Sequence, residues 1–458
     1  LRRQRQMCIR DSIGPSGSGK STLSNCINGL IPFSYEGDST GTLKIEGKDP
    51  KKLGIFGLSK MVGTVLQDTD GQFIGLTVAE DIAFVLENDC MAQEEMFRKV
   101  DGVAETVEVK ELLHHAPSEM SGGQKQRVSM AGVMIDDVDI LLFDEPLANL
   151  DPATGKKAIA LIDRIQKEQK KTIVIIEHRL EDVLYKDVDR IVVVGEGTIV
   201  ADMKPDDLLA GNILKEQGIR EPLYVTALKH AGCTIAAEDH PQHVETMNFE
   251  PYRAQVREWF ETTKIPQKQE AEEKVLNVDH LHFSYQPGKA ILSDISFDVK
   301  KGEMISIVGK NGAGKTTLSN LICGFLEPSN GKIELNGKDI SPLSVKERGE
   351  HIGIVMQNPN QMISKPMIYE EVALGLMVRG VPEEEIRERV YETLKICGLY
   401  QFRNWPVSAL SFGQKKRVTI ASILVMKPEI LILDEPTAGQ DYRHYTEIME
   451  FLKTINET

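Results

Sequence analysis

The chain has 458 residues, more than one hydrophobic core usually supports, so we expect two domains of roughly 200 residues each. Its net charge of -15 argues against a partner held through many phosphate contacts, which makes nucleic acid a poor candidate. The six cysteines lie far apart without a CxxC pair, as in reduced thiols of a cytosolic protein, and no apolar stretch approaches the roughly eighteen residues of a membrane-spanning helix.

The first segment, residues 1–12, is basic and has neither an apolar core nor a cleavage signature, so it does not resemble a secretory signal. RDSI, at Arg10 to Ile13, stands just before the first copy of the repeat described next, where the second copy has the strand-like MISIV at Met304 to Val308. We therefore expect residues 1–12 to be foreign to the first domain and poorly structured. The leading sheet of that domain is expected to precede Leu1.

One internal repeat organises the chain. Gly14 to Ser21 reads GPSGSGKS, and Gly309 to Thr316 reads GKNGAGKT, 295 residues later. From Gln67 onward, matching positions recur at a spacing of 290, so the first copy carries five extra residues. They fall near IPFSYEGDST, residues 31–40, where the composition is typical of a loop and an insertion costs little. The constant register indicates two duplicated domains.

The glycine-rich motif has the spacing GxxxxGK[ST] of a P-loop. Its glycines let backbone N–H groups and a helix N-terminus surround nucleotide phosphates. Lys20 and Lys315 would reach the β and γ phosphates, and the hydroxyls of Ser21 and Thr316 would bind Mg²⁺. A single match could be a glycine-rich turn that merely opens a helix, but two matches in register favour nucleotide binding.

Two apolar runs end in paired acids: ILLFDE at Ile140 to Glu145 and ILILDE at Ile430 to Glu435. Each run predicts a buried parallel strand that delivers its acids to the ligand edge of a sheet. The aspartates would hold Mg²⁺ through its water shell, and the glutamates would polarise the attacking water, a role that contributes roughly 10²- to 10⁴-fold. The alternative is a solvated acidic pair at a strand end.

Between the P-loop and the acids lie SGGQKQR, Ser121 to Arg127, and SFGQKKR, Ser411 to Arg417. With these signatures the chain resembles the ATP-binding cassette superfamily. The resemblance implies an α/β fold of two P-loop NTPase cassettes, each with a mainly parallel core sheet, an antiparallel subdomain and a helical signature subdomain. It also implies that the cassettes pair head to tail, within one chain or with another copy. Each of two composite sites then holds ATP between one P-loop and the opposite signature.

The resemblance assigns site residues position by position. The catalytic residues would be Glu145, Glu435 and the switch histidine His178. The ATP contacts would be Gly14, Pro15, Ser16, Gly17, Ser18, Gly19, Lys20, Ser21, Thr22, Gly309, Lys310, Asn311, Gly312, Ala313, Gly314, Lys315, Thr316, Thr317, Tyr285, Ser121, Gly122, Gly123, Gln124, Ser411, Gly413 and Gln414. The metal ligands would be Ser21, Gln67, Asp144, Thr316, Gln357 and Asp434.

Two of these assignments have structural alternatives. An isolated histidine after a strand, such as His178, is more often structural than catalytic. Tyr285 matches the aromatic residue on which adenine stacks, but a strand tyrosine is commonly core packing. The chain also departs from the family pattern. Phe412 replaces Gly122 of the first signature, which is either tolerated or slows one site, and the second switch histidine is expected at position 468.

These landmarks divide the chain into residues 1–12, a first cassette at 13–216, an insert at 217–273 and a second cassette at 274–458. The insert matches neither copy. It contains the helical-looking EPLYVTALKHAGC, Glu221 to Cys233, and ends in IPQKQEAEEK, which is typical of a linker. It could be a small accessory domain.

The segments EHRLEDV, at Glu177 to Val183, and LSFGQKKR, at Leu410 to Arg417, look like those of duplicated energy-coupling-factor ATPases. Such proteins use ATP and Mg²⁺ at the cytoplasmic face of the membrane to power import of vitamins, precursors or metal ions. They bind an integral membrane subunit near Gln67 and Gln357. The alternatives are a sugar-type importer ATPase and a tandem-cassette translation factor. The translation factor should carry a basic interdomain arm, whereas this segment ends acidic.

Overall fold

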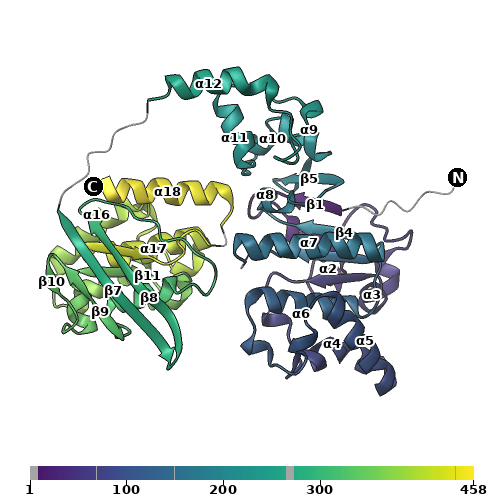
Figure 1. The fold of residues 1–458 in the computed structure, drawn as a ribbon, viewed down its shortest axis with the longest axis horizontal. Helices are drawn as coiled ribbons and strands as arrows, with labels where there is room; N and C mark the ends of the chain where they lie inside the picture. Colours follow the sequence, from purple (N-terminus) through teal and green to yellow (C-terminus); the bar gives the residue numbers. More distant parts are fainter. Residues whose placement is uncertain (1–8, 69, 149, 265–272, 439, 458) are drawn as a thin grey trace. The chain divides into compact units, whose positions relative to one another are not determined.

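The computed structural model describes residues 9–68, 70–148, 150–264, 273–438 and 440–457. The chain forms two compact units. The first contains Leu1–Lys264 with Asp441–Arg443, and the second contains Ile265–Gln440 with His444–Thr458. Each unit is α/β, which confirms the expected fold class of two P-loop cassettes (Figure 1).

The core of the first unit is a six-stranded sheet in the order β2-β3-β4-β1-β5-β6. All neighbours are parallel except the pair β5 and β6. Its centre is apolar along consecutive residues, as in Leu141, Leu142 and Phe143, because a parallel sheet is covered on both faces. The strands are β1 (Ile9–Ile13), β2 (Val62–Val65), β3 (Ile140–Asp144), β4 (Thr172–Ile176), β5 (Arg190–Gly195) and β6 (Thr198–Met203).

The prediction that residues 1–12 are poorly structured is wrong for Ile9 to Ser12. These residues form most of β1, which lies between β4 and β5 and pairs in parallel with both. Strand pairing uses backbone N–H and C=O groups, which RDSI supplies as well as an apolar sequence does, and two neighbouring strands provide partners. Residues 1–8 of that prediction lie outside the described part of the chain.

Helices surround this sheet and form a separate helical part around α4, α5 and α6 (Figure 1). Asp151 caps α7 by accepting hydrogen bonds from the N–H groups of Ala153 and Thr154, with Pro152 at the first helical position. The helices are α1 (Lys20–Ile27), α2 (Leu30–Phe33), α3 (Pro50–Ser59), α4 (Val78–Asn88), α5 (Gln93–Thr106), α6 (Gly122–Met134), α7 (Pro152–Gln169) and α8 (Leu180–Val183).

The insert does not form a compact unit of its own. Its described residues continue the hydrophobic core of the first unit, for example through Leu228, Ile235 and Tyr252. The helical interpretation of Glu221 to Cys233 is confirmed by α11, whereas residues 265–272 of the proposed linker lie outside the described residues. The helices of the insert are α11 (Leu223–His230) and α12 (Arg253–Thr262), and α9 (Pro205–Ala210) and α10 (Ile213–Glu216) precede it.

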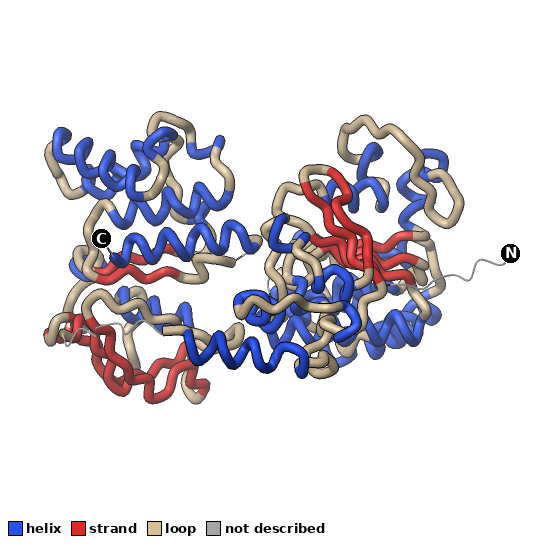
Figure 2. The backbone as a smooth tube through the Cα atoms, turned by 90° about the horizontal axis from the view of Figure 1, so that it is seen from above, coloured by secondary structure: helices blue, strands red, loops and turns tan. Residues whose placement is uncertain are grey.

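The second unit contains an antiparallel sheet in the order β10-β9-β7-β8 and a parallel pair, β11 and β12. Figure 2 shows its antiparallel strands set apart from its helices. The strands are β7 (Lys274–Gln286), β8 (Lys289–Lys300), β9 (Asn330–Leu335), β10 (Lys338–Asp339), β11 (Ile352–Val355) and β12 (Ile430–Leu433). The helices are α13 (Lys315–Cys323), α14 (Val345–Arg348), α15 (Ile368–Val378), α16 (Glu383–Ile396), α17 (Phe412–Leu424) and α18 (Tyr442–Glu457).

The strand predicted at Met304 to Val308 is not formed, and the side chain of Val308 is 84% exposed. In the first unit the corresponding strand, β1, is held between β4 and β5. The described residues of the second unit contain no counterpart of either neighbour, so the backbone groups of 304–308 have no ladder to join. Among the helices in the described ranges of both units, none combines the length and the apolar composition that a membrane span requires.

Candidate active site

The two P-loops have the same local geometry. Gly19 and Gly314 precede α1 and α13 with φ of 101° and 92°, a left-handed conformation that favours glycine. Lys20 Nζ donates to the carbonyl oxygens of Gly14 at 2.8 Å and Pro15 at 2.9 Å. Lys315 Nζ does the same with Gly309 at 2.9 Å and Lys310 at 3.1 Å. Each ammonium group is therefore held over its own loop, at the start of a helix.

Burial lowers the pKa of Lys20, and the nearby carboxylate of Glu145 opposes that fall. A P-loop lysine that stays positively charged can pair with phosphate as a point charge. The two lysines differ in burial, since Lys20 is buried whereas Lys315 is partly exposed.

The P-loop hydroxyls lie beside the aspartates that end the central strands. Ser21 Oγ is 3.5 Å from Asp144 Oδ1, and Thr316 Oγ1 donates to Asp434 Oδ2 at 2.9 Å. Burial raises the pKa of Asp144, and the Ser21 hydroxyl opposes that rise. A hydroxyl and a carboxylate are hard oxygen ligands of the kind that Mg²⁺ takes together with water and phosphate oxygens. The side chains present thus fit the ion that the sequence predicts.

Each glutamate after those aspartates is held by a glutamine from a different strand end. Gln67 Nε2 donates to Glu145 Oε2 at 2.7 Å, and Gln357 Nε2 donates to Glu435 Oε2 at 2.6 Å. Glu145 and Glu435 have φ of 47° and 45°, which is uncommon for residues other than glycine and marks a sharp turn after the strand. The same unusual backbone and the same amide contact therefore occur twice.

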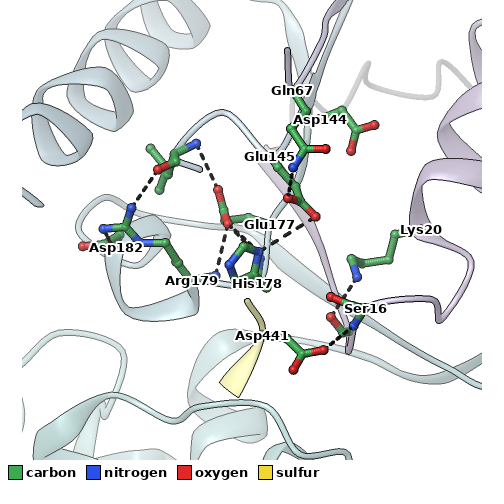
Figure 3. A network of polar contacts seen from close by, with 12 residues as sticks. Ser16, Lys20, Gln67, Asp144, Glu145, Glu177, His178, Arg179, Asp182 and Asp441 are labelled. Atoms are coloured by element: carbon green, nitrogen blue, oxygen red, sulfur yellow. Dashed lines mark hydrogen bonds and ion pairs between the residues drawn. The ribbon is translucent and has the colours of Figure 1, made fainter. Parts of the chain in front are cut away.

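His178 lies beside Glu145 (Figure 3). Its Nδ1 is 3.9 Å from Glu145 Oε1 and 3.3 Å from Glu177 Oε1. Burial lowers the pKa of His178, while Glu145 opposes that fall, and burial raises the pKa of Glu145. The arrangement places an imidazole and a carboxylate side by side, in keeping with the predicted switch role. Glu177 was not predicted as a site residue from the sequence. The only signal for it there is its position before His178 in EHRLEDV.

The two signature serines begin helices, as predicted. Ser121 and Ser411 are the N-caps of α6 and α17, and each backbone N–H donates to Oε1 of a glutamine three residues on, Gln124 at 2.8 Å and Gln414 at 3.0 Å. Ser411 Oγ accepts a hydrogen bond from the N–H of Gln414 at 3.3 Å. The first residues of both helices are exposed or half-buried, so both helix N-termini are open to solvent, and helix N-termini attract anions.

Phe412 stands at the first position of α17 with its side chain 44% exposed. Ser411, Gly413 and Gln414 line a cavity of about 210 Å³, and Phe412 is not among the residues that line it. Lys416 Nζ lies 5.4 Å from the centre of the Phe412 ring. This geometry agrees with the alternative in which phenylalanine is tolerated at this position of the signature.

Tyr285 is not a core residue, because its side chain is 60% exposed. Its hydroxyl lies 3.3 Å from Thr317 Oγ1 in the first turn of α13, and its ring meets Phe283 edge to face. The tyrosine is thus beside the second P-loop with ring surface free for an aromatic ligand.

Each unit therefore gathers its own P-loop, glutamine, aspartate and glutamate into one group. The tandem duplication seen in the sequence is repeated in the geometry. The ABC transporter family matches residues 10–148 and 292–438, which include both groups. The chain belongs to the ABC transporter family. A second family, described as ATP-binding cassette cobalt transporter, matches residues 211–283 and so covers the insert.

Relatives in this family align over nearly the whole chain. A protein of Clostridium perfringens named as an ABC transporter ATP-binding protein is 60% identical over 444 residues, which are 97% of this chain and 78% of that protein. A protein of Enterococcus faecalis with the same name is 59% identical over 446 residues, with 97% and 78% covered. The chain is accordingly an ATP-binding subunit of the ABC transporter type, a class of ATPases.

A solved structure of an archaeal ribosome recycling factor, in complex with a ribosomal stalk protein, aligns with 98% of this chain and 78% of its own. The TM-score is 0.58 and the identity is 22%. At this identity the likeness concerns the tandem-cassette fold alone.

Proposed function

We propose that this chain hydrolyses ATP to power a membrane importer of the energy-coupling-factor type, which takes up a vitamin, a precursor or a metal ion. The observation that supports the importer class is the insert, whose residues match a family described as ATP-binding cassette cobalt transporter. The cargo would be bound by membrane subunits encoded elsewhere, and the ATPase would associate with the cytoplasmic face of the membrane through them.

In this proposal the nucleotide is bound by the P-loop amides and by the lysines Lys20 and Lys315. Mg²⁺ would supply charge neutralisation at the phosphates, held by the Ser21–Asp144 and Thr316–Asp434 pairs. Glu145 and Glu435 then orient and polarise the attacking water, with Gln67 and Gln357 fixing one oxygen of each carboxylate. His178 would contact the γ phosphate and steady Glu145. Each signature helix would serve the site of the other cassette.

The translation-factor alternative has less support. Residues 217–273 contain six Lys and Arg against ten Asp and Glu, a balance opposite to that of an arm that binds ribosomal RNA. The likeness to the ribosome recycling factor concerns fold only, because the identity is low.

The membrane partner can be tested at the apolar surface beside Gln67. Leu76 is 82% exposed, and Leu66 and Ile74 are exposed with it. Leu76→Lys should abolish co-purification of the protein with an integral membrane protein and leave ATP hydrolysis by the isolated protein unchanged, because a charge cannot be buried in an apolar interface without a partner. Detergent extracts of membranes, followed by affinity capture and identification of the bound proteins, provide the measurement.

Ile199→Lys is the matched control, since Ile199 on β6 is 62% exposed and lies in the same unit. It should retain the membrane partner. Recovery of ribosomes in place of a membrane protein would refute the importer proposal. If Leu76→Lys and the parent protein capture the membrane protein equally, the surface around Leu76 does not bind that partner.

A further inference from the structure

The chain that follows Glu145 is tied to the turn that carries His178 by two side chains from that turn. Glu177 is completely buried. Its Oε2 accepts a hydrogen bond from the N–H of Leu147 at 3.1 Å, and its Oε1 accepts bonds from the N–H groups of His178 at 2.9 Å and Arg179 at 3.3 Å. A single carboxylate thus joins two segments that are thirty residues apart (Figure 3).

Arg179 holds the same segment from the carbonyl side. Its Nη1 donates to the carbonyl oxygens of Leu147 at 2.7 Å and Leu150 at 3.1 Å, while Nη2 pairs with Asp182 at 2.6 Å. Both polar backbone groups of Leu147 are therefore bound by side chains of the His178 turn, and the Leu147 side chain is fully buried. Such a doubly anchored residue leaves the chain after Glu145 little freedom to move independently of His178.

The backbone on the other side of Glu145 is anchored as well. The N–H of Glu145 donates to the carbonyl of Ile176 at 2.8 Å, and the N–H of Glu177 donates to the carbonyl of Ser12 at 3.2 Å. Burial raises the pKa of Glu177, and its backbone N–H donors together with Arg179 oppose that rise. A buried carboxylate with several donors is costly to replace, since any change leaves some of them unpaired.

We propose that Glu177 is a positioning residue for ATP hydrolysis: with Arg179 it locks the segment that follows Glu145 to the His178 turn and thereby sets the spacing of His178 and Glu145. This inference rests on the proposed roles of Glu145 and His178. Neither Glu177 nor Arg179 lies among the residues that would touch the nucleotide, so they act through the pair that they hold.

The test substitution is Glu177→Gln in the full-length protein. A glutamine keeps the shape, but its N–H₂ must face either the N–H of Leu147 or those of the turn, so one side of the connection opens. We expect kcat for ATP to fall at least about tenfold, with KM for ATP within about twofold of the parent value, because the P-loop is untouched. Glu181→Gln, at an exposed glutamate of the neighbouring α8, is the control and should match the parent protein.

The double variant Glu177→Gln/His178→Ala separates positioning from a general structural role. If Glu177 acts through His178, the double variant should be as slow as His178→Ala alone. Multiplied effects of the two substitutions, or a parent-like kcat for Glu177→Gln beside a slow His178→Ala, would overturn this inference alone. A parent-like His178→Ala would contradict the proposed role of the histidine instead.

Arg179→Lys keeps the inference testable if Glu177→Gln does not fold. A lysine retains the charge next to Asp182, but it lacks the planar fork that reaches both the Leu147 and the Leu150 carbonyl. The same loss of kcat with little change in KM is expected. If Glu177→Gln does not fold and Arg179→Lys has a parent-like kcat, the proposal is also overturned.

Discussion

Three carboxylates crowd the end of β3 in the first cassette: Asp144, Glu145 and Glu177. Burial raises the pKa of each, because a charged carboxylate is less stable in the folded protein than in water. Lys20 and His178 offset part of this cost at Glu145. Sites that concentrate charge in this way are commonly stabilised when a catalytic group is neutralised, at the expense of activity.

Glu145→Gln should therefore make the nucleotide-free protein more stable and much less active. ATP hydrolysis by this cassette is expected to fall by about 10²-fold or more, because an amide cannot polarise water as a carboxylate does. Unfolding of the first cassette should shift upward by about 1 kcal/mol, equivalent to about 2–4 °C for a domain of this size. Calorimetry and an ATPase assay check the two effects.

The stability gained by Glu145→Gln should depend on pH, and the raised pKa of Glu145 gives the direction of that dependence. A carboxyl group with a folded-state pKa above its ordinary value of 4.5 binds more protons when folded, so its destabilising effect is absent below pH 4.5 and complete above the raised pKa. The gain from Glu145→Gln should therefore be present at pH 7 and shrink toward pH 4.5. A gain of equal size at both pH values would show that charge is not its cause.

At the scale of single elements, the proposed ATP sites depend on how certain helices begin. The same capping box occurs at Ser411, which begins α17, and at Ser344, which begins α14. In both, a serine Oγ accepts the N–H of the residue three positions on, at 3.3 Å, and that residue's side chain binds back to the serine N–H. Only α17 belongs to a signature motif, so the N-termini of α17 and α14 provide a matched comparison.

Ser411→Ala and Ser344→Ala should each cost about 1 kcal/mol of stability, because each removes an N-cap acceptor. ATP hydrolysis should fall only in Ser411→Ala, since the hydroxyl of Ser411 is proposed to face a γ phosphate and that of Ser344 is not. Thermal unfolding and steady-state ATPase assays of both variants give the measurement. Equal activity of the two variants would argue that Ser411 serves only as a helix cap.

The two cassettes matter at the scale of the whole molecule, because each carries half of both proposed composite sites. Their internal geometry is parallel: the lysine, hydroxyl–aspartate and glutamine–glutamate contacts all occur twice. They differ at Phe412, which stands where the first signature has Gly122. This difference would allow the two proposed sites to hydrolyse ATP at different rates.

Head-to-tail pairing predicts which substitutions act on the same site. In the full-length protein, Ser411→Arg should add little to the loss caused by Lys20→Met, because both would disable one composite site, whereas it should compound the loss caused by Lys315→Met. Non-additivity of this kind is expected only for residues that act as a unit. Single-turnover ATPase measurements on the three single variants and the two paired variants check it, and the opposite pattern would place each signature with the P-loop of its own cassette.

The sequence by itself determined the duplication, the fold class and the family, because GxxxxGK[ST], the paired acids and the SGGQ-like signatures depend on local spacing that a chain must keep to bind phosphate at a helix start. It also placed both signature serines at helix N-caps. Its errors concerned strands: RDSI joined a sheet and MISIV did not, since strand formation depends on neighbours that are distant in the chain.

Only the tertiary structure decided which groups meet. The left-handed turns at Glu145 and Glu435, the amide contacts from Gln67 and Gln357, and the continuation of the insert into the first core depend on packing between segments far apart in sequence. Glu177 shows this most clearly. In the sequence only its place directly before His178 sets it apart, and its three backbone partners come together only when β4 and the chain after β3 lie side by side.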